Sequence, residues 1–168
     1  RLLIDDSGIN QDSAILVEHL GIKFLNLNDC KIQDRMDQLV KEHGPIDVMT
    51  QQFSGAVMHP ICYDYSSEEY KQISKKKRLA KMQGVLRVIK KVSPRMFFPS
   101  AGPAAFLSPE LFHLNFEVGG VFPKSWDFCN FLKDKEPSLY VADVSPGGTI
   151  TVKDSSILVN GISKPMGN

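Results

Sequence analysis

The sequence predicts an α/β protein that ends in a small β region. Short apolar runs alternate with segments of helical spacing over the first hundred residues, a pattern typical of strands and helices packed in layers. The chain has 168 residues, enough for one domain with a core but not comfortably for two. Its 42% hydrophobic and 23% charged residues are typical of soluble globular proteins, which argues against disordered, collagen-like and coiled-coil chains.

Five apolar runs are expected to form the strands of the α/β layer. They are residues 2–4, 14–17, 22–27, 46–49 and 96–98. The run at 14–17 is apolar on both sides, which predicts a strand in the middle of a sheet. A turn is expected at 5–8, where the sequence reads Asp-Asp-Ser-Gly.

Three helices are expected between and after these strands. The first carries apolar residues at helical spacing over 32–40 and stops at His43-Gly44-Pro45. The longest runs over 67–92, begins at a serine cap and ends before Ser93-Pro94. Its apolar stripe is expected to consist of Leu79, Met82, Leu86 and Ile89. The third is a short helix over 126–132.

The C-terminal tail is expected to be a β meander. Three short β-like runs lie between 138 and 160, broken at 145–148 and 153–155. The chain is accordingly divided into 1–137, the main layer, and 138–168, the meander or tail.

The net charge and the cysteine content limit the classes of binding partner and the cellular location that are expected. The net charge of +1 gives no global electrostatic case for a nucleic acid or a membrane surface as partner. Cys30, Cys62 and Cys129 are odd in number and form no CxxC pair, which favours reduced thiols and a cytoplasmic location. No apolar run approaches the roughly 20 residues that span a bilayer. Residue 1 is Arg rather than Met, so a processed chain or a piece of a longer protein is expected.

Three loops follow the carboxyl ends of predicted strands, the edge where α/β sheets bind ligands. Asp29 stands in the first loop, where a carboxylate either caps the next helix or binds a metal. Ser54-Gly55 stands in the second; Gln52 replaces the first glycine of a nucleophile elbow, which favours a tight turn over a catalytic serine. Ala101-Gly102 stands in the third, and His59 is the histidine nearest this edge.

The charge is unevenly distributed along the chain. Residues 1–47 carry nine acids and five bases, whereas residues 66–95 carry ten bases and two acids. A basic helix face could attract an anion. No aromatic residues interleave with these bases, which favours a solvated helix face instead.

Several blocks of sequence together resemble a known family. They are Asp12-Ser13-Ala14-Ile15, Leu25-Asn26-Leu27-Asn28-Asp29-Cys30, Gln52-Phe53-Ser54-Gly55-Ala56, Lys77-Arg78 with Met82, Pro99-Ser100-Ala101-Gly102-Pro103, and Phe106-Leu107 with Glu110-Leu111-Phe112 and Asn115. In this order they resemble the C-terminal half of the metallo-β-lactamase-fold domain of Rieske-associated proteins, which are related to CMP-N-acetylneuraminate hydroxylase. The resemblance covers roughly residues 2–125.

The resemblance implies a fold and a site. The fold would be an αββα sandwich, of which this chain is the second half. Asp29 would be the metal-bridging aspartate, while Ser54, Gly55, Ala101 and Gly102 would shape the substrate pocket. His59 is expected at the same pocket from its place in the loop after Gly55. Two further histidines of the family are missing: Gly8 stands at one position, and the loop 99–103 has none. The HxHxDH metal motif and the CxH…CxxH motif of the Rieske cluster are also absent from this chain.

The resemblance therefore implies a fragment of a metal-dependent enzyme. Zinc or iron would be held mostly by residues outside this chain, and a 2Fe-2S cluster would lie elsewhere in the protein. The expected reaction is a Rieske-linked oxygenation of an anionic, nucleotide-sugar-like substrate, or a metal-dependent hydrolysis on the same fold. The expected partner is the N-terminal half of the domain or a second copy. A metal-free binding or structural module is the alternative, and this chain alone is expected to be inactive.

Overall fold

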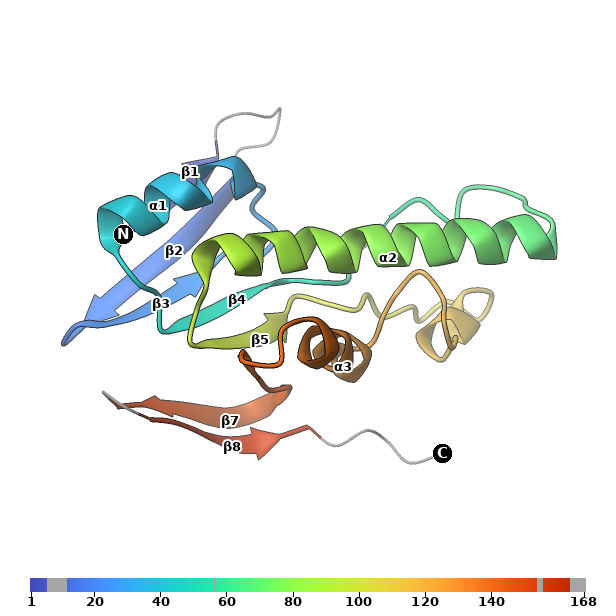
Figure 1. Ribbon diagram of the computed structural model, residues 1–168. Helices are drawn as coiled ribbons and strands as arrows, with labels where there is room; N and C mark the ends of the chain where they lie inside the picture. Colours follow the sequence, from blue (N-terminus) through green and yellow to red (C-terminus); the bar gives the residue numbers. More distant parts are fainter. Residues whose placement is uncertain (6–11, 56, 154–155, 164–168) are drawn as a thin grey trace.

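The structure, a computed structural model, describes residues 1–5, 12–55, 57–153 and 156–163 (Figure 1). Its centre is a mixed sheet in the spatial order β1-β2-β3-β4-β5-β6. The strands are β1 (Leu2–Asp5), β2 (Asp12–His19), β3 (Ile22–Asn26), β4 (Val48–Gln52), β5 (Met96–Ser100) and β6 (Tyr140–Val141). The pairs β1–β2 and β2–β3 are antiparallel, and every later pair is parallel.

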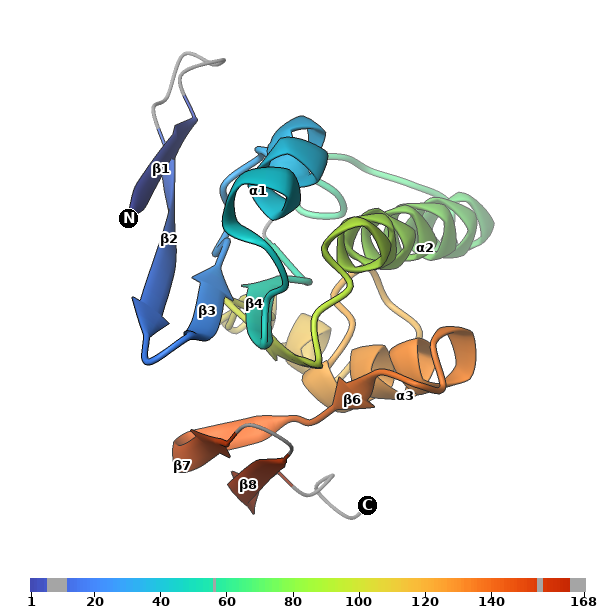
Figure 2. The same cartoon turned by 60° about the vertical axis from the view of Figure 1, so that its left-hand side comes forward.

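Three helices cover one face of this sheet (Figure 2). They are α1 (Met36–His43), preceded by the short 3-10 turn η1 (Gln33–Arg35), α2 (Ser67–Val92) and α3 (Ser125–Lys135). Fully buried side chains from the sheet, Leu25, Met49 and Phe97, pack there against Phe128 and Leu132 of α3. A second 3-10 turn, η2 (Phe112–Asn115), lies between β5 and α3.

The long helix α2 begins and ends where the sequence predicts. Ser66 Oγ accepts a hydrogen bond from the Glu69 backbone N–H at 3.3 Å, and the Glu69 carboxylate accepts one from the Ser66 N–H at 3.1 Å. This capping box fixes the first turn, and Ser93 ends the helix in the left-handed conformation (φ 49°).

The predicted apolar stripe of α2 is wrong at one end. Leu79 is 40% exposed, whereas Val85 and Val88, which the prediction omits, are buried. The helix extends beyond the sheet in Figure 1, so its N-terminal half has no strand beneath it to bury an apolar side chain.

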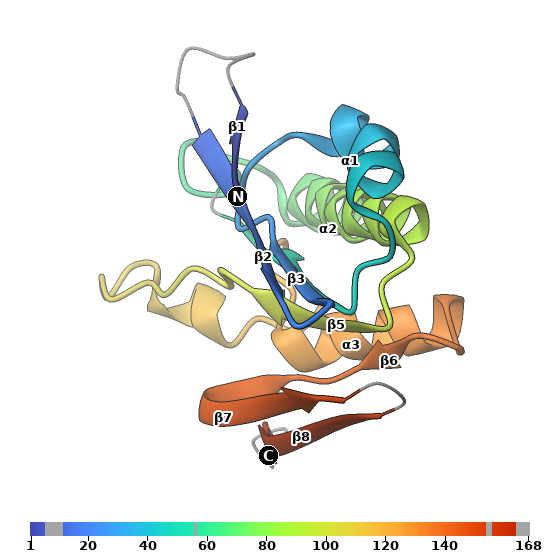
Figure 3. The same cartoon turned by 90° about the vertical axis from the view of Figure 1, so that its left-hand side faces the viewer.

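The opposite face of the sheet carries a hairpin of β7 (Val144–Val152) and β8 (Ile157–Ile162) (Figure 3). Here the predicted meander is wrong, because β6 joins the main sheet and only β7 and β8 form a separate one. The expected break at 145–148 is a bulge within β7, where the register shifts between Val144 and Thr149. Gly147 allows the bulge because its φ is +82°.

The same face is uncovered farther along the sheet. Leu2 and Ile4 of β1 are 56% and 51% exposed, and Ile15 and Val17 of β2 are 46% and 49% exposed. The expectation of a strand buried on both sides at 14–17 is therefore wrong for this chain. Only the alternate residues, Ala14 and Leu16, face the helices and are buried.

Some expectations fall outside the described residues. These are most of the turn at 5–8, including Gly8, then Ala56, and most of the break at 153–155. Of the helices that the structure describes, none has the length and apolar character needed to cross a membrane.

Candidate functional site

The segment after β3 is held against β4, so that it extends the edge of the sheet. The Leu27 N–H donates to the Thr50 carbonyl at 3.0 Å, and the Gln52 N–H donates to the Asn28 carbonyl at 2.6 Å. Asn28 adopts the left-handed conformation (φ 46°), which a short polar side chain tolerates. Because β3, β4 and β5 are parallel, their carboxyl ends lie at this one edge.

Asp29 is exposed at this edge. One carboxylate oxygen, Oδ1, accepts a hydrogen bond from Asn28 Nδ2 at 2.8 Å. Of the two alternatives for Asp29, the helix cap is wrong, since η1 is preceded by Ile32 and α1 by Arg35, and neither element has a side-chain cap. The carboxylate oxygens of Asp29 therefore remain available to a ligand. In a capping aspartate, these oxygens would accept hydrogen bonds from backbone N–H groups.

A cavity of 270 Å³ lies beside Asp29. Polar side chains from the strand edge and α2 share its lining: Asp29, Lys31, Gln51, Gln52 and Lys81. Gln51 Oε1 is buried and has no hydrogen-bond partner in the described part of the chain. A buried acceptor without a partner costs free energy unless a ligand or water satisfies it.

Lys81 reaches the cavity from α2. Its Nζ donates to the Gly55 carbonyl at 2.5 Å and lies 5.5 Å from the centre of the Phe122 ring. Burial lowers the pKa of Lys81, and the positive charge of Lys77 lowers it further. The carbonyl and the ring help to hold the ammonium group beside the loop after β4.

The loops after β4 and β5 touch through a glycine. A methyl group at Gly102 would lie 2.6 Å from the Ser54 carbonyl oxygen, so a side chain there would collide with backbone. Ser54 is fully buried, and neither it nor Gly102 lines the cavity beside Asp29. Ala101 and Gly102 instead line a second cavity, under the hairpin. Of the predicted pocket residues, the structure thus brings only Gly55 to Asp29.

His59 lies apart from both cavities. It is 2% exposed, and its Nε2 is 2.8 Å from Ser74 Oγ. Its ring centre lies 5.0 Å from that of Tyr65 and 5.5 Å from that of Tyr70. Burial lowers the pKa of His59, the charge of Lys77 lowers it further, and Glu117 opposes them. His59 is therefore a buried ring that packs against two tyrosines and contacts Ser74, away from the cavity at Asp29.

Besides Lys81, the helix α2 carries basic side chains that lie in solvent and others that form ion pairs. Lys75, Lys76 and Lys77 are exposed. Arg78 pairs with Asp127 of α3 at 3.2 Å, and Lys91 pairs with Asp37 of α1 at 2.7 Å. These contacts connect α2 to its neighbouring helices.

The described residues do not complete a metal site or an iron–sulfur site. Among them, no group of three or more His, Cys, Asp or Glu side chains could hold a metal ion. Cys30 and Cys129 are buried and Cys62 is exposed. Zinc sites use three or four protein ligands, and a Rieske cluster uses two Cys and two His. Asp29 could contribute one ligand but needs others.

Sequence reasoning does not single out Gln51 or Lys81 as site residues. Gln51 carries a weak signal, because it is a polar residue at the end of an apolar strand. Lys81 carries none, because it belongs to a helix rich in lysine and its partner Gly55 is far away in the sequence.

No protein-family model matches the chain. Curated relatives do match. The chain is 34% identical over 125 residues to proteins of two Mycobacterium tuberculosis strains, CDC 1551 and H37Rv, each named "Putative Rieske 2Fe-2S iron-sulfur protein". A protein of Mycolicibacterium smegmatis with the same description matches to the same extent. Each match covers 73% of this chain and 24% of the relative, so the chain spans about a quarter of these proteins' length.

The chain is similar to part of a Rieske-type iron–sulfur protein. This agrees with the Rieske association that the sequence blocks imply.

Proposed function

We propose that this chain is the second half of a metallo-β-lactamase-like αββα domain in a longer Rieske-associated protein. In this proposal Asp29 supplies one ligand to a zinc or iron ion, and the remaining ligands come from outside the chain. The full-length protein would then be a metal-dependent, Rieske-linked oxygenase.

The main support is the position of Asp29. It lies on the shared carboxyl edge of three parallel strands, caps neither η1 nor α1, and lines a cavity with Gln51 Oε1, which has no partner among the described residues. Carboxylate and amide oxygens can bind a metal ion directly or accept a hydrogen bond from a metal-bound water. The edge is also where α/β sheets bind ligands.

The uncovered sheet face supports the second-half assignment. Leu2, Ile4, Ile15 and Val17 leave a row of apolar side chains half exposed, while the helices cover only the other face. An exposed apolar patch on a sheet is typical of a surface that another segment or protein covers. The N-terminal half of the domain is the layer we propose, and a second copy of the chain is the other candidate.

The cavity chemistry indicates an anionic substrate. Lys31 and Lys81 line the cavity together with Asp29, so a substrate phosphate or carboxylate could pair with an ammonium while the metal lies at the carboxylate. A bound metal would supply Lewis-acid activation. The residues of this chain would orient the substrate and hold one side of the ion.

Metal analysis of the full-length protein tests the proposal. Asp29→Asn keeps the size of the side chain and removes its charge, and should lower by at least half the zinc or iron that the protein binds in excess of the two iron atoms of its 2Fe-2S cluster. Asp34→Asn is the matched control, because Asp34 is another exposed aspartate a few residues farther along the chain. Equal metal content in both variants and the wild type would exclude Asp29 as a ligand.

A metal-free binding module is the second candidate. It is favoured by the lack of a three-ligand cluster in the part of the chain that the structure describes. Full-length protein purified without chelators and carrying less than about half a metal ion per chain beyond the two iron atoms of its 2Fe-2S cluster would favour this candidate, since an occupied site holds one ion or more.

A further inference from the structure

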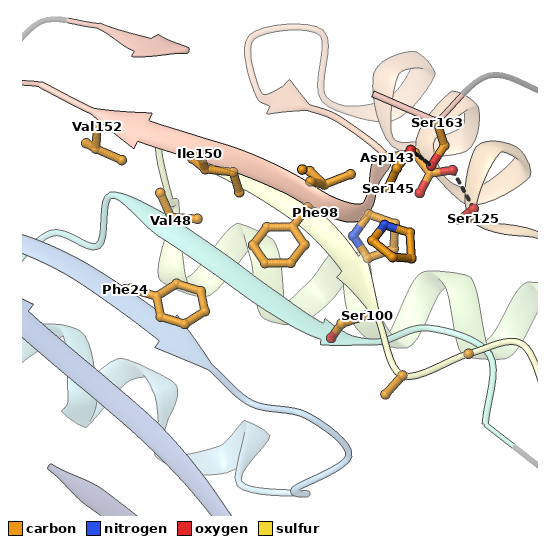
Figure 4. A pocket seen from close by; sticks show the side chains of 16 residues that line it. Phe24, Val48, Phe98, Ser100, Ser125, Asp143, Ser145, Ile150, Val152 and Ser163 are labelled. Carbon is orange, nitrogen blue, oxygen red and sulfur yellow. Dashed lines mark hydrogen bonds between the residues drawn. The ribbon is translucent and has the colours of Figure 1, made fainter. Parts of the chain in front are cut away.

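A second, larger cavity lies between the sheet and the hairpin, on the face of the sheet opposite the helices (Figure 4). Its volume is 760 Å³, within the range of small-molecule sites. The cavity is open to solvent, so a small molecule could enter it.

One end of this cavity is apolar and flat. Phe24 of β3 and Phe98 of β5 lie on either side of β4, and their rings are stacked with centroids 6.2 Å apart and planes 5° from parallel. Val48 adjoins them, and Ile150 and Val152 of β7 face them across the cavity. Both phenylalanine rings are only partly buried, so a planar apolar group could cover them.

The other end is polar and carries a negative charge. Asp143 accepts a hydrogen bond from Ser125 Oγ at 2.5 Å, and Ser145 Oγ lies 2.9 Å from Ser163 Oγ. Figure 4 shows these four side chains gathered at the end of the cavity away from Phe24 and Val48. Within the described residues no cation pairs with Asp143, and its carboxylate keeps acceptor capacity.

The negative charge of Asp143 affects the pKa of a neighbouring thiol. The pKa of the neighbouring Cys129 thiol is raised to about 12, first by burial and then by the negative charge of Asp143. A cation in the cavity would compensate this charge, whereas an anion would be repelled. The hydroxyl groups around Asp143 can orient an N–H donor.

We propose that this cavity binds a small cationic amphiphile: a flat, apolar body that lies on Phe24 and Phe98, with a protonated amine directed at Asp143. The site differs from the one proposed at Asp29 in position and in charge. It uses the hairpin face of the sheet and selects a cation, whereas the cavity at Asp29 is lined by α2.

Calorimetric titration of the full-length protein with two matched probes tests this inference. Tryptamine carries an aromatic body and a protonated amine, and tryptophol is the same molecule with a neutral hydroxyl group. Tryptamine should bind more tightly, by about tenfold to a hundredfold, because it makes a charge-assisted hydrogen bond. This comparison requires no variant, so it does not depend on the folding of a mutant.

Variants then assign the contacts. Asp143→Asn should remove the preference for tryptamine and leave tryptophol affinity within about twofold, while Phe98→Ala should weaken both probes. Asp134→Asn, at an exposed site on α3, should change neither. Equal affinities in the wild type, an unchanged preference in Asp143→Asn, or no binding of tryptamine because a segment of the longer protein fills the cavity would each overturn the inference.

Discussion

The contact between Gly102 and Ser54 makes a quantitative prediction about the edge of the sheet. Replacing Gly102 by Ala places a Cβ atom 2.6 Å from the Ser54 carbonyl oxygen and 3.0 Å from its carbonyl carbon. Real Cβ contacts of this length do not occur, and Ser54 cannot yield easily because it is fully buried. Overpacking of this kind costs about 1–3 kcal/mol.

The free energy of unfolding, measured by urea denaturation, should therefore fall by about 1–3 kcal/mol in Gly102→Ala. Gly84→Ala is the matched control. A methyl group at Gly84 meets only an Arg87 side-chain nitrogen at 3.8 Å, and alanine favours the interior of α2 by up to about 1 kcal/mol. The two variants should thus change stability in opposite directions. A Gly102→Ala protein within about 0.5 kcal/mol of the wild type would refute the close packing of these two loops.

Three further outcomes follow from the contacts. Ser66→Ala should lower the free energy of unfolding by about 1 kcal/mol through loss of the capping box, with Ser67→Ala near neutral as its control in the same denaturation assay. Asn115→Ala should cost about 2 kcal/mol, because the Asn115 amide exchanges hydrogen bonds with the backbone N–H and carbonyl of Phe106 at 2.8 and 2.6 Å; no loss of stability would contradict this role. Stability should also fall as pH rises from about 8.5, the pKa of an unfolded thiol, towards about 12, the pKa of folded Cys129, because the folded state then binds more protons than the unfolded state. Cys129→Ala should flatten that pH dependence, and an equal slope in the variant would show that other groups cause it.

The bounds of the long helix and the strand at 96–98 are predictable because they depend on residues close together in the sequence. Ser66 and Glu69 form a capping box within one turn of helix, and Ser93-Pro94 ends the helix, so the bounds of α2 follow from neighbouring residues. The strand at 96–98 is likewise an apolar run, bounded by Arg95 and Pro99, and the structure extends it to Ser100.

Other features depend on contacts between distant segments. Ile15 and Val17 are half exposed because no described segment of this chain covers that part of the sheet, so their apolar character alone does not predict their burial. The bulge at Gly147 resembles a turn in sequence, and only its partner β8 shows that the strand continues.

The candidate site shows the same division. The position of Asp29 at the edge of the sheet is predictable because this residue follows a strand of apolar residues. The separation of Gly55 from Gly102 into two cavities is not, since it depends on which face of the sheet each loop turns towards. The approach of Lys81 to Gly55 depends on the position of α2 over that edge.

A crystal structure of the full-length, metal-loaded protein tests the central claim most directly. We predict that an oxygen of Asp29 lies about 2.0–2.2 Å from a zinc or iron ion, the distance of a carboxylate ligand. We also predict that a second β layer from the same protein, or from a second copy, covers Ile15 and Val17. A metal ion bound without Asp29, or Ile15 and Val17 still facing solvent in the full-length protein, would contradict the assignment of this chain as half of a metal-binding sandwich.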